Sequence, residues 1–273
     1  MLGKLIKHEL RHSARYTLAI YAAVVAAIAV MGISLLTGSM WLGVISCFAL
    51  YVVGFAAVVV TLVSVIKNFY DTLFSRQGYL TLTLPVKGST LLVSKVLVSI
   101  IWIIISFVAM GLTFLVIFYY GKEQSGGAIE SLWGVISMSG LLEALPSTAV
   151  IIEFIAVLAF LAISTIITYV GYVYFTVTLA NTRALQKHPK FFGGMIFFAI
   201  VALVNAISSK LTEIIPLTLN VSTEKVYFSF TQMGYESGVI ISYGIGGTIF
   251  SALVAVGLLF ATGYILEHKV NLK

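Results

Sequence analysis

Residues 96–120 read VLVSIIWIIISFVAMGLTFLVIFYY, without one charged side chain. The hydrocarbon core of a bilayer is about 30 Å thick, so a helix needs about 20 apolar residues to cross it. Residues 96–120 are therefore predicted to form a membrane-spanning helix. Five other runs meet the same length: residues 16–36, 42–66, 149–180, 191–209 and 239–265. Within all six runs, Glu153 is the only formally charged side chain.

The composition of the whole chain agrees with six spans. Of the 273 residues, 60% are hydrophobic and 10% are charged, whereas a soluble domain averages about 25% charged residues. We therefore predict an all-α polytopic membrane protein with six transmembrane helices, forming a single transmembrane domain over residues 1–273. The first span is full length and is expected to stay uncleaved rather than act as a signal peptide.

The distribution of Lys and Arg predicts the orientation. Six spans place both termini and the loops 67–95 and 181–190 on one side, and this side carries 13 of the 16 basic residues. Basic residues are enriched on the cytoplasmic side of a membrane, so both termini are predicted to be cytoplasmic. The protein itself is predicted to lie in the plasma membrane. The net charge of +6 is thus a topology signal, and nucleic-acid binding is not predicted.

The N-terminal residues 1–15, MLGKLIKHELRHSAR, are amphipathic at a helical period. The basic face of this helix is predicted to meet anionic lipid headgroups, with the apolar face toward the acyl chains. A plain positively charged anchor fits the pattern equally well. The basic face consists of Lys4, Lys7, Arg11 and Arg15.

The same segment contains His8-Glu9-Leu10-Arg11-His12, which matches the zinc-protease pattern HExxH. Zinc chemistry would need both imidazoles, a third ligand and the glutamate as a base. Arg11 would stand close to the metal, and no third ligand is evident in the sequence. Zinc binding is therefore only the weaker interpretation.

The loop KNFYDTLFSRQGYLTLTLPVKGSTLLVSK, residues 67–95, combines charges with apolar residues. An apolar surface held just outside a membrane usually contacts a partner protein. The alternation of Tyr79–Leu84 by itself favours a strand.

Residues 75–95 of this loop resemble permeases of the type-2 family of ATP-binding-cassette (ABC) exporters. The matching positions are Arg76, Gly78, Leu80, Leu84, Pro85, Val86, Ser94 and Lys95. Gln77 stands where the family often has a glutamate. The order of six spans after a basic amphipathic N-terminus is similar as well.

The resemblance implies a cytoplasmic coupling helix around residues 70–84, ending before Pro85, which docks on a separate ABC ATPase subunit, and a second permease subunit in a homodimer or heterodimer. It also implies short re-entrant helices between the fifth and sixth spans. The expected ATPase contact comprises Phe74, Arg76, Gln77, Gly78, Tyr79, Leu80, Leu82, Leu84 and Pro85.

Some features outside the loop carry weaker expectations. Glu153 either lines a substrate path or rests at the outer interface near a helix N-terminus, the latter being favoured. Gly244-Ile-Gly-Gly247 is interpreted as a close-packing site or a point of bending. Residues 128–145 could form a short amphipathic helix before Pro146. Cys47 is the single cysteine, so it has no intrachain disulfide partner.

The sequence contains no GxxxxGK[ST] motif, so the chain is not predicted to hydrolyse ATP itself. No catalytic residue, metal site or cofactor is predicted. The expected function is the membrane-spanning subunit of an ATP-driven exporter. The alternatives are a zinc protease acting through residues 8–12 and a non-transporting membrane anchor or sensor subunit.

Overall fold

The computed structural model describes residues 2–74, 88–124, 148–182, 185, 188–222, 226–230 and 239–268. The chain divides into two units, Met1–Trp133 and Gly134–Lys273. Each unit is built around long apolar helices and is described on its own.

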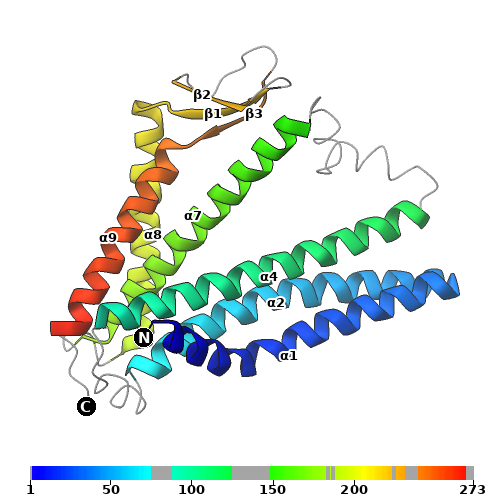
Figure 1. The fold of residues 1–273 in the computed structure, drawn as a ribbon, viewed down its shortest axis with the longest axis horizontal. Coiled ribbons are helices and arrows are strands. Elements are labelled where there is room, and N and C mark those ends of the chain that lie inside the picture. Colours follow the sequence, from blue (N-terminus) through cyan, green and yellow to red (C-terminus); the bar gives the residue numbers. More distant parts are fainter. Residues whose placement is uncertain are drawn as a thin grey trace. The chain divides into compact units, whose positions relative to one another are not determined.

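The described part of the first unit contains three helices that pack on one another (Figure 1). They are α1 (Leu2–Thr37), α2 (Met40–Phe74) and α4 (Gly88–Gln124). Gly38 joins α1 to α2 with a φ of 62°, a left-handed conformation that glycine adopts without a steric penalty. Since α1 ends at Thr37 and α2 begins at Met40, the two helices form a tight hairpin.

Small residues allow the helices of the first unit to approach closely. A Cβ atom at Gly43 would overlap the ring of Tyr120, and one at Gly54 would meet Thr113. Tyr120 packs with Met31 and Leu50 in the core at this end of the unit. The α2 glycines therefore decide how near α4 can come.

The second unit combines three helices with a small sheet. The helices are α7 (Thr148–Ala180), α8 (Pro189–Ile214) and α9 (Gly246–His268). Between α8 and α9 lie β1 (Thr218–Ser222), β2 (Val226–Ser229) and β3 (Val239–Gly244), in the order β2-β1-β3 with both pairings antiparallel. Leu219 is opposite Phe228 on one side and Tyr243 on the other.

This sheet corrects two predictions. Residues 218–222 and 226–229 form strands, so the re-entrant helices expected there are wrong for these residues. The sixth helix begins at Gly246 rather than Val239, because residues 239–244 pair with β1. A run rich in β-branched and aromatic residues suits a strand as well as an apolar helix. The all-α description therefore holds for the six long helices and not for this segment.

The glycines after β3 form a close-packing site, as expected. A Cβ atom at Gly247 would lie 3.0 Å from the carbonyl oxygen of Ser208, and one at Gly246 would lie 3.1 Å from that of Ile215. The first turn of α9 therefore packs directly on the last turns of α8.

The N-terminal segment is not a separate helix, because α1 runs without interruption from Leu2 to Thr37. Lys4, Lys7 and Arg11 are exposed, whereas Glu9 and Ser13 are buried. Arg15 lies within the same helix. Contact between this basic surface and lipid headgroups remains a prediction.

Six described helices are long and apolar enough to cross a membrane: residues 17–37, 40–74, 88–121, 152–180, 191–214 and 246–267. These ranges confirm the six predicted spans, although the second, third and fifth helices extend beyond the predicted ends. The predicted helix at residues 128–145 lies outside the described residues.

Candidate functional site

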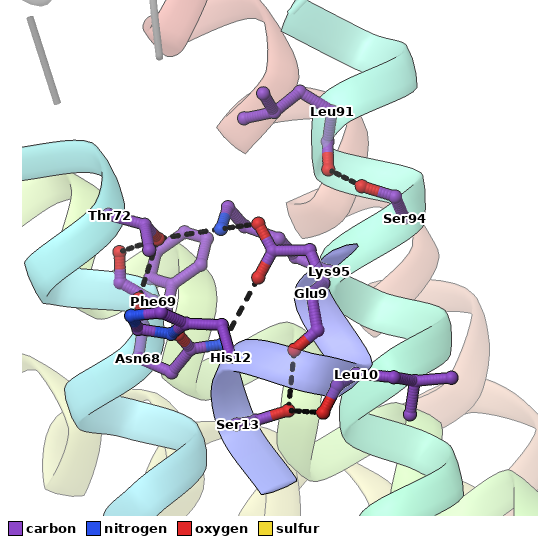
Figure 2. Close-up of polar contacts among 10 residues, drawn as sticks. All are labelled: Glu9, Leu10, His12, Ser13, Asn68, Phe69, Thr72, Leu91, Ser94 and Lys95. Carbon is purple, nitrogen blue, oxygen red and sulfur yellow. Dashed lines mark hydrogen bonds and ion pairs between the residues drawn. The ribbon is translucent and has the colours of Figure 1, made fainter. Parts of the chain in front are cut away.

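A buried ion pair joins α4 to α1 in the first unit (Figure 2). The Nζ atom of Lys95 lies 2.6 Å from Oε1 of Glu9. The side chain of Lys95 is 1% exposed and that of Glu9 is 11% exposed. Charges are buried in this way only when they are paired and hydrogen-bonded.

Helix α2 supplies further partners of this pair. Lys95 Nζ also donates to Thr72 Oγ1 at 2.6 Å, and Thr72 Oγ1 donates to the carbonyl oxygen of Asn68 at 2.6 Å. Asn68 Nδ2 donates to the second oxygen of Glu9 at 3.3 Å. His12 Nδ1 lies 3.1 Å from Asn68 Oδ1. We refer to Glu9, His12, Asn68, Thr72 and Lys95 as the polar cluster, and Figure 2 shows its members converging from three helices.

Helical spacing explains why each helix delivers its polar residues to one place. Glu9 and His12 are three residues apart on α1, and Asn68 and Thr72 are four apart on α2. Residues at these separations share a helix face. Each of these two helices thus contributes a pair of polar side chains to the cluster.

A second polar layer continues from the cluster along the same helices. Trp102 Nε1 donates to Ser13 Oγ at 2.8 Å, while Ser13 Oγ donates to the Glu9 carbonyl oxygen at 2.7 Å. Tyr21 stacks on Trp102 with ring centroids 6.0 Å apart, and its hydroxyl lies 3.1 Å from Thr61 Oγ1. These contacts fix the rotation of α1 against its two neighbours.

The polar cluster lies at the roots of the loop that the sequence singled out. Thr72 is two residues before Phe74, where α2 ends, and Lys95 is seven residues after Gly88, where α4 begins. Residues 75–87 connect the end of α2 to the start of α4. The cluster therefore links these two helix ends to each other and to α1.

Of the residues predicted to contact the ATPase, the structure describes only Phe74. Phe74 is half-buried at the end of α2, and its ring packs against Phe69 and Tyr70. The other predicted contact residues lie outside the described residues: Arg76, Gln77, Gly78, Tyr79, Leu80, Leu82, Leu84 and Pro85. The coupling helix thus remains a prediction beyond residue 74.

The residues of the HExxH motif make contacts that differ from those of zinc ligands. The Glu9 carboxylate is bound by Lys95 and Asn68, His12 contacts Asn68, and His8 is exposed. Within the described ranges, no group of three or more His, Cys, Asp or Glu side chains could hold a metal ion. The arrangement favours a structural role for Glu9 over that of a base.

Glu153 lies near the start of α7 and is exposed. This position agrees with a carboxylate near a helix N-terminus, where negative charge is favourable. Glu153 belongs to the second unit, whereas the polar cluster belongs to the first.

Sequence reasoning missed the pairing of Glu9 with Lys95, although both residues were noted separately. The signal was present in the spacing of the polar residues. Positions 95, 99, 102 and 106 follow one face of α4, and they carry Lys, Ser, Trp and Ser in a largely apolar helix.

The outer surfaces of these helices define the class of protein. Large apolar side chains are widely exposed on both units, among them Phe48, Phe198 and Phe260, each more than 70% exposed. A soluble protein does not tolerate apolar surface on this scale, whereas lipid covers it without cost. The chain is a multi-pass α-helical membrane protein. No protein-family model, curated protein or solved structure matches it.

Proposed function

We propose that the chain is the membrane-spanning subunit of an ATP-driven ABC exporter. A separate ABC ATPase subunit would dock on the loop after the second span, and a second permease subunit would complete the transporter. Six apolar helices, the bias of basic residues to one side and the resemblance of residues 75–95 support this proposal. The protein would lie in the plasma membrane, with both termini in the cytoplasm.

The observation that carries the proposal is the position of the polar cluster. A loop passes force into a bilayer only if the helix ends that hold it move together. Lys95 on α4 bonds to Thr72 near the end of α2 and to Glu9 on α1, with contacts of 2.6 Å in both cases. Movement of the loop would therefore displace three helices as one body.

The docking contact would be a short helix seated in a groove of the ATPase, with apolar anchors and a polar rim. Leu80, Leu82 and Leu84 are the proposed anchors. Full burial of a leucine contributes about 1.5–3 kcal/mol before association costs are subtracted. Three such anchors suit a stable subunit contact.

The double substitution Leu80→Asp with Leu82→Asp is expected to abolish co-purification of a nucleotide-hydrolysing subunit, because two charges would be forced into an apolar groove. The measurement is affinity purification of the full chain from the cells that naturally produce it. Mass spectrometry would then identify and quantify the subunits that co-purify. Size-exclusion chromatography would check that the variant stays folded.

Leu36→Asp with Met40→Asp is the matched control. Both residues are exposed, at 89% and 68%, and lie at the α1–α2 hairpin, away from the loop in sequence. This variant should keep the ATPase. A folded wild-type chain that recruits no ATPase would overturn the proposal, and an ATPase partner without substrate movement in vesicles would favour the anchor or sensor alternative.

A further inference from the structure

The strands β1, β2 and β3 form a sheet with one apolar and one polar face. Paired residues of antiparallel strands point to the same face, and successive residues of a strand alternate between the two faces. One face carries large, mainly apolar side chains: Leu219, Val226, Phe228 and Tyr243. The other face carries mostly small polar residues: Thr218, Asn220, Tyr227, Ser229, Ser242 and Gly244. The three strands contain no charged side chain.

The apolar face is most exposed at strand β2, on one edge of the sheet. Phe228 is 69% exposed, and Phe230, which directly follows the end of β2 at Ser229, is 76% exposed. On the central strand β1, Leu219 is only 3% exposed, because strands flank it on both sides. The exposed apolar surface of the sheet is therefore concentrated at two phenylalanine rings, whose contact with water is unfavourable.

Tyr243 shows which way the apolar face is turned. Its side chain lines a cavity together with Tyr169 of α7 and Thr248 of α9. Since Tyr243 and Phe228 share a face, the face that carries Phe228 is turned toward the helices of this unit. These helices span the bilayer, so the apolar face is turned toward the bilayer. Ser242, on the opposite face, is exposed.

The sheet is fixed at the place where two of the spans end (Figure 1). Strand β1 begins four residues after α8 ends at Ile214, and β3 ends two residues before α9 begins at Gly246. The backbone N–H of Ile245 donates to the carbonyl oxygen of Leu217 at 2.9 Å, which ties the two ends of the sheet together. Ile214 is itself 75% exposed. The lipid-covered surface of α8 thus reaches the residues at which the sheet begins.

We infer that the sheet lies flat on the membrane surface, with Phe228 and Phe230 inserted among the lipids of the adjoining leaflet. Aromatic side chains are favoured at this depth. The strands themselves stay at the level of the headgroups, because open sheet edges do not occur within the hydrocarbon. Helix α7 supports this placement, since it contacts β2 and exposes Ile152 and Phe160 in its first half.

A second protein is a less suitable occupant of this face. A standard protein interface buries about 800 Å² per partner, whereas one aromatic side chain buries about 150–250 Å². Phe228 and Phe230 together therefore supply about 500 Å² at most, which is well below that area. Lipid needs no minimum area and no matching shape, and it already covers the adjacent end of α8.

Spin labelling of the full chain in phosphatidylcholine vesicles tests the inference. Phe228→Cys and Phe230→Cys are labelled with a nitroxide, one at a time, in a Cys47→Ala background. Ser242→Cys, exposed on the opposite face, is the matched control, and Phe198→Cys, at a position 72% exposed on α8, is the lipid reference. For each label, the rate of collision with oxygen, which concentrates in lipid, is compared with that of a nickel chelate, which stays in water.

The ratio of oxygen to nickel collisions at Phe228→Cys and Phe230→Cys should exceed the ratio at Ser242→Cys several-fold and approach the ratio at Phe198→Cys. Equal ratios at positions 228, 230 and 242 would mean that the apolar face lies in water. Low collision rates with both reagents at positions 228 and 230 would mean that a protein, such as a second copy of the chain, covers this face. Either result would overturn the inference.

A lipid with a photoreactive group in its acyl chain tests the unmutated chain, should a labelled variant misfold. Cross-links at residues 226–230 would support the inference. A chain that is cross-linked along α8 but not at residues 226–230 would contradict it. The inference does not depend on the proposed ATPase partner.

Discussion

Lys95→Met lowers the free energy of unfolding by about 3–5 kcal/mol, the expected loss when one partner of a buried ion pair is removed. The methionine fills similar space, but the Glu9 carboxylate then stays buried without its counter-ion. The remaining hydrogen bond from Asn68, at 3.3 Å, is too long to replace the lost charge. Denaturant unfolding of the purified chain in detergent would measure the change.

Two controls make this expectation specific. The double variant Glu9→Met with Lys95→Met should be far more stable than the single variant, because apolar replacement of a whole buried pair is often neutral. Lys210→Met breaks an ion pair of 2.9 Å whose side chains are 73% and 65% exposed, so it should cost less than about 1 kcal/mol. Equal losses for Lys95→Met and Lys210→Met would contradict the importance of the polar cluster.

The double variant also separates stability from mechanism. If the cluster serves to move three helices together, the double variant should fold and yet couple poorly to its proposed ATPase. Apolar packing of the two methionines can replace the energy of the ion pair but does not reproduce its directed contacts at 2.6 Å.

The six long helices were predictable because hydropathy reports directly on the cost of placing side chains in lipid. The ends of the helices were less predictable. Residues 239–244 form β3, whose apolar side chains resemble those of a span, and only pairing with β1 decides between strand and helix. That pairing depends on residues some 20 positions earlier in the chain, which no local pattern contains.

The polar cluster shows a similar limit. Glu9 and Lys95 are 86 residues apart, so their contact follows from how α1 packs against α4 and not from either local sequence. Within residues 8–12, Glu9 matched a zinc motif, and near residue 95 the lysine matched a permease motif. Polar residues spaced three or four apart in apolar helices were the one feature that indicated a buried network.

Gly171→Leu is expected to separate α7 from α9 and to destabilise the second unit by at least 1–3 kcal/mol, roughly the cost of overpacking a close contact. A Cβ atom at position 171 would lie 3.0 Å from the Ala255 carbonyl oxygen and 3.1 Å from the Ala255 Cβ. One of these atoms belongs to the backbone, so a side-chain rotation cannot relieve the clash. The neighbouring core of Tyr172, Val204 and Ala255 would be opened as well.

Gly257→Leu is the matched control, because a Cβ atom at Gly257 on α9 meets nothing within 4 Å. Leucine is a better helix former than glycine by somewhat under 1 kcal/mol, so this variant should be neutral or slightly more stable. Thermal unfolding followed by circular dichroism in detergent compares the two. If Gly171→Leu unfolds no earlier than Gly257→Leu, α7 and α9 are not held in contact at Gly171.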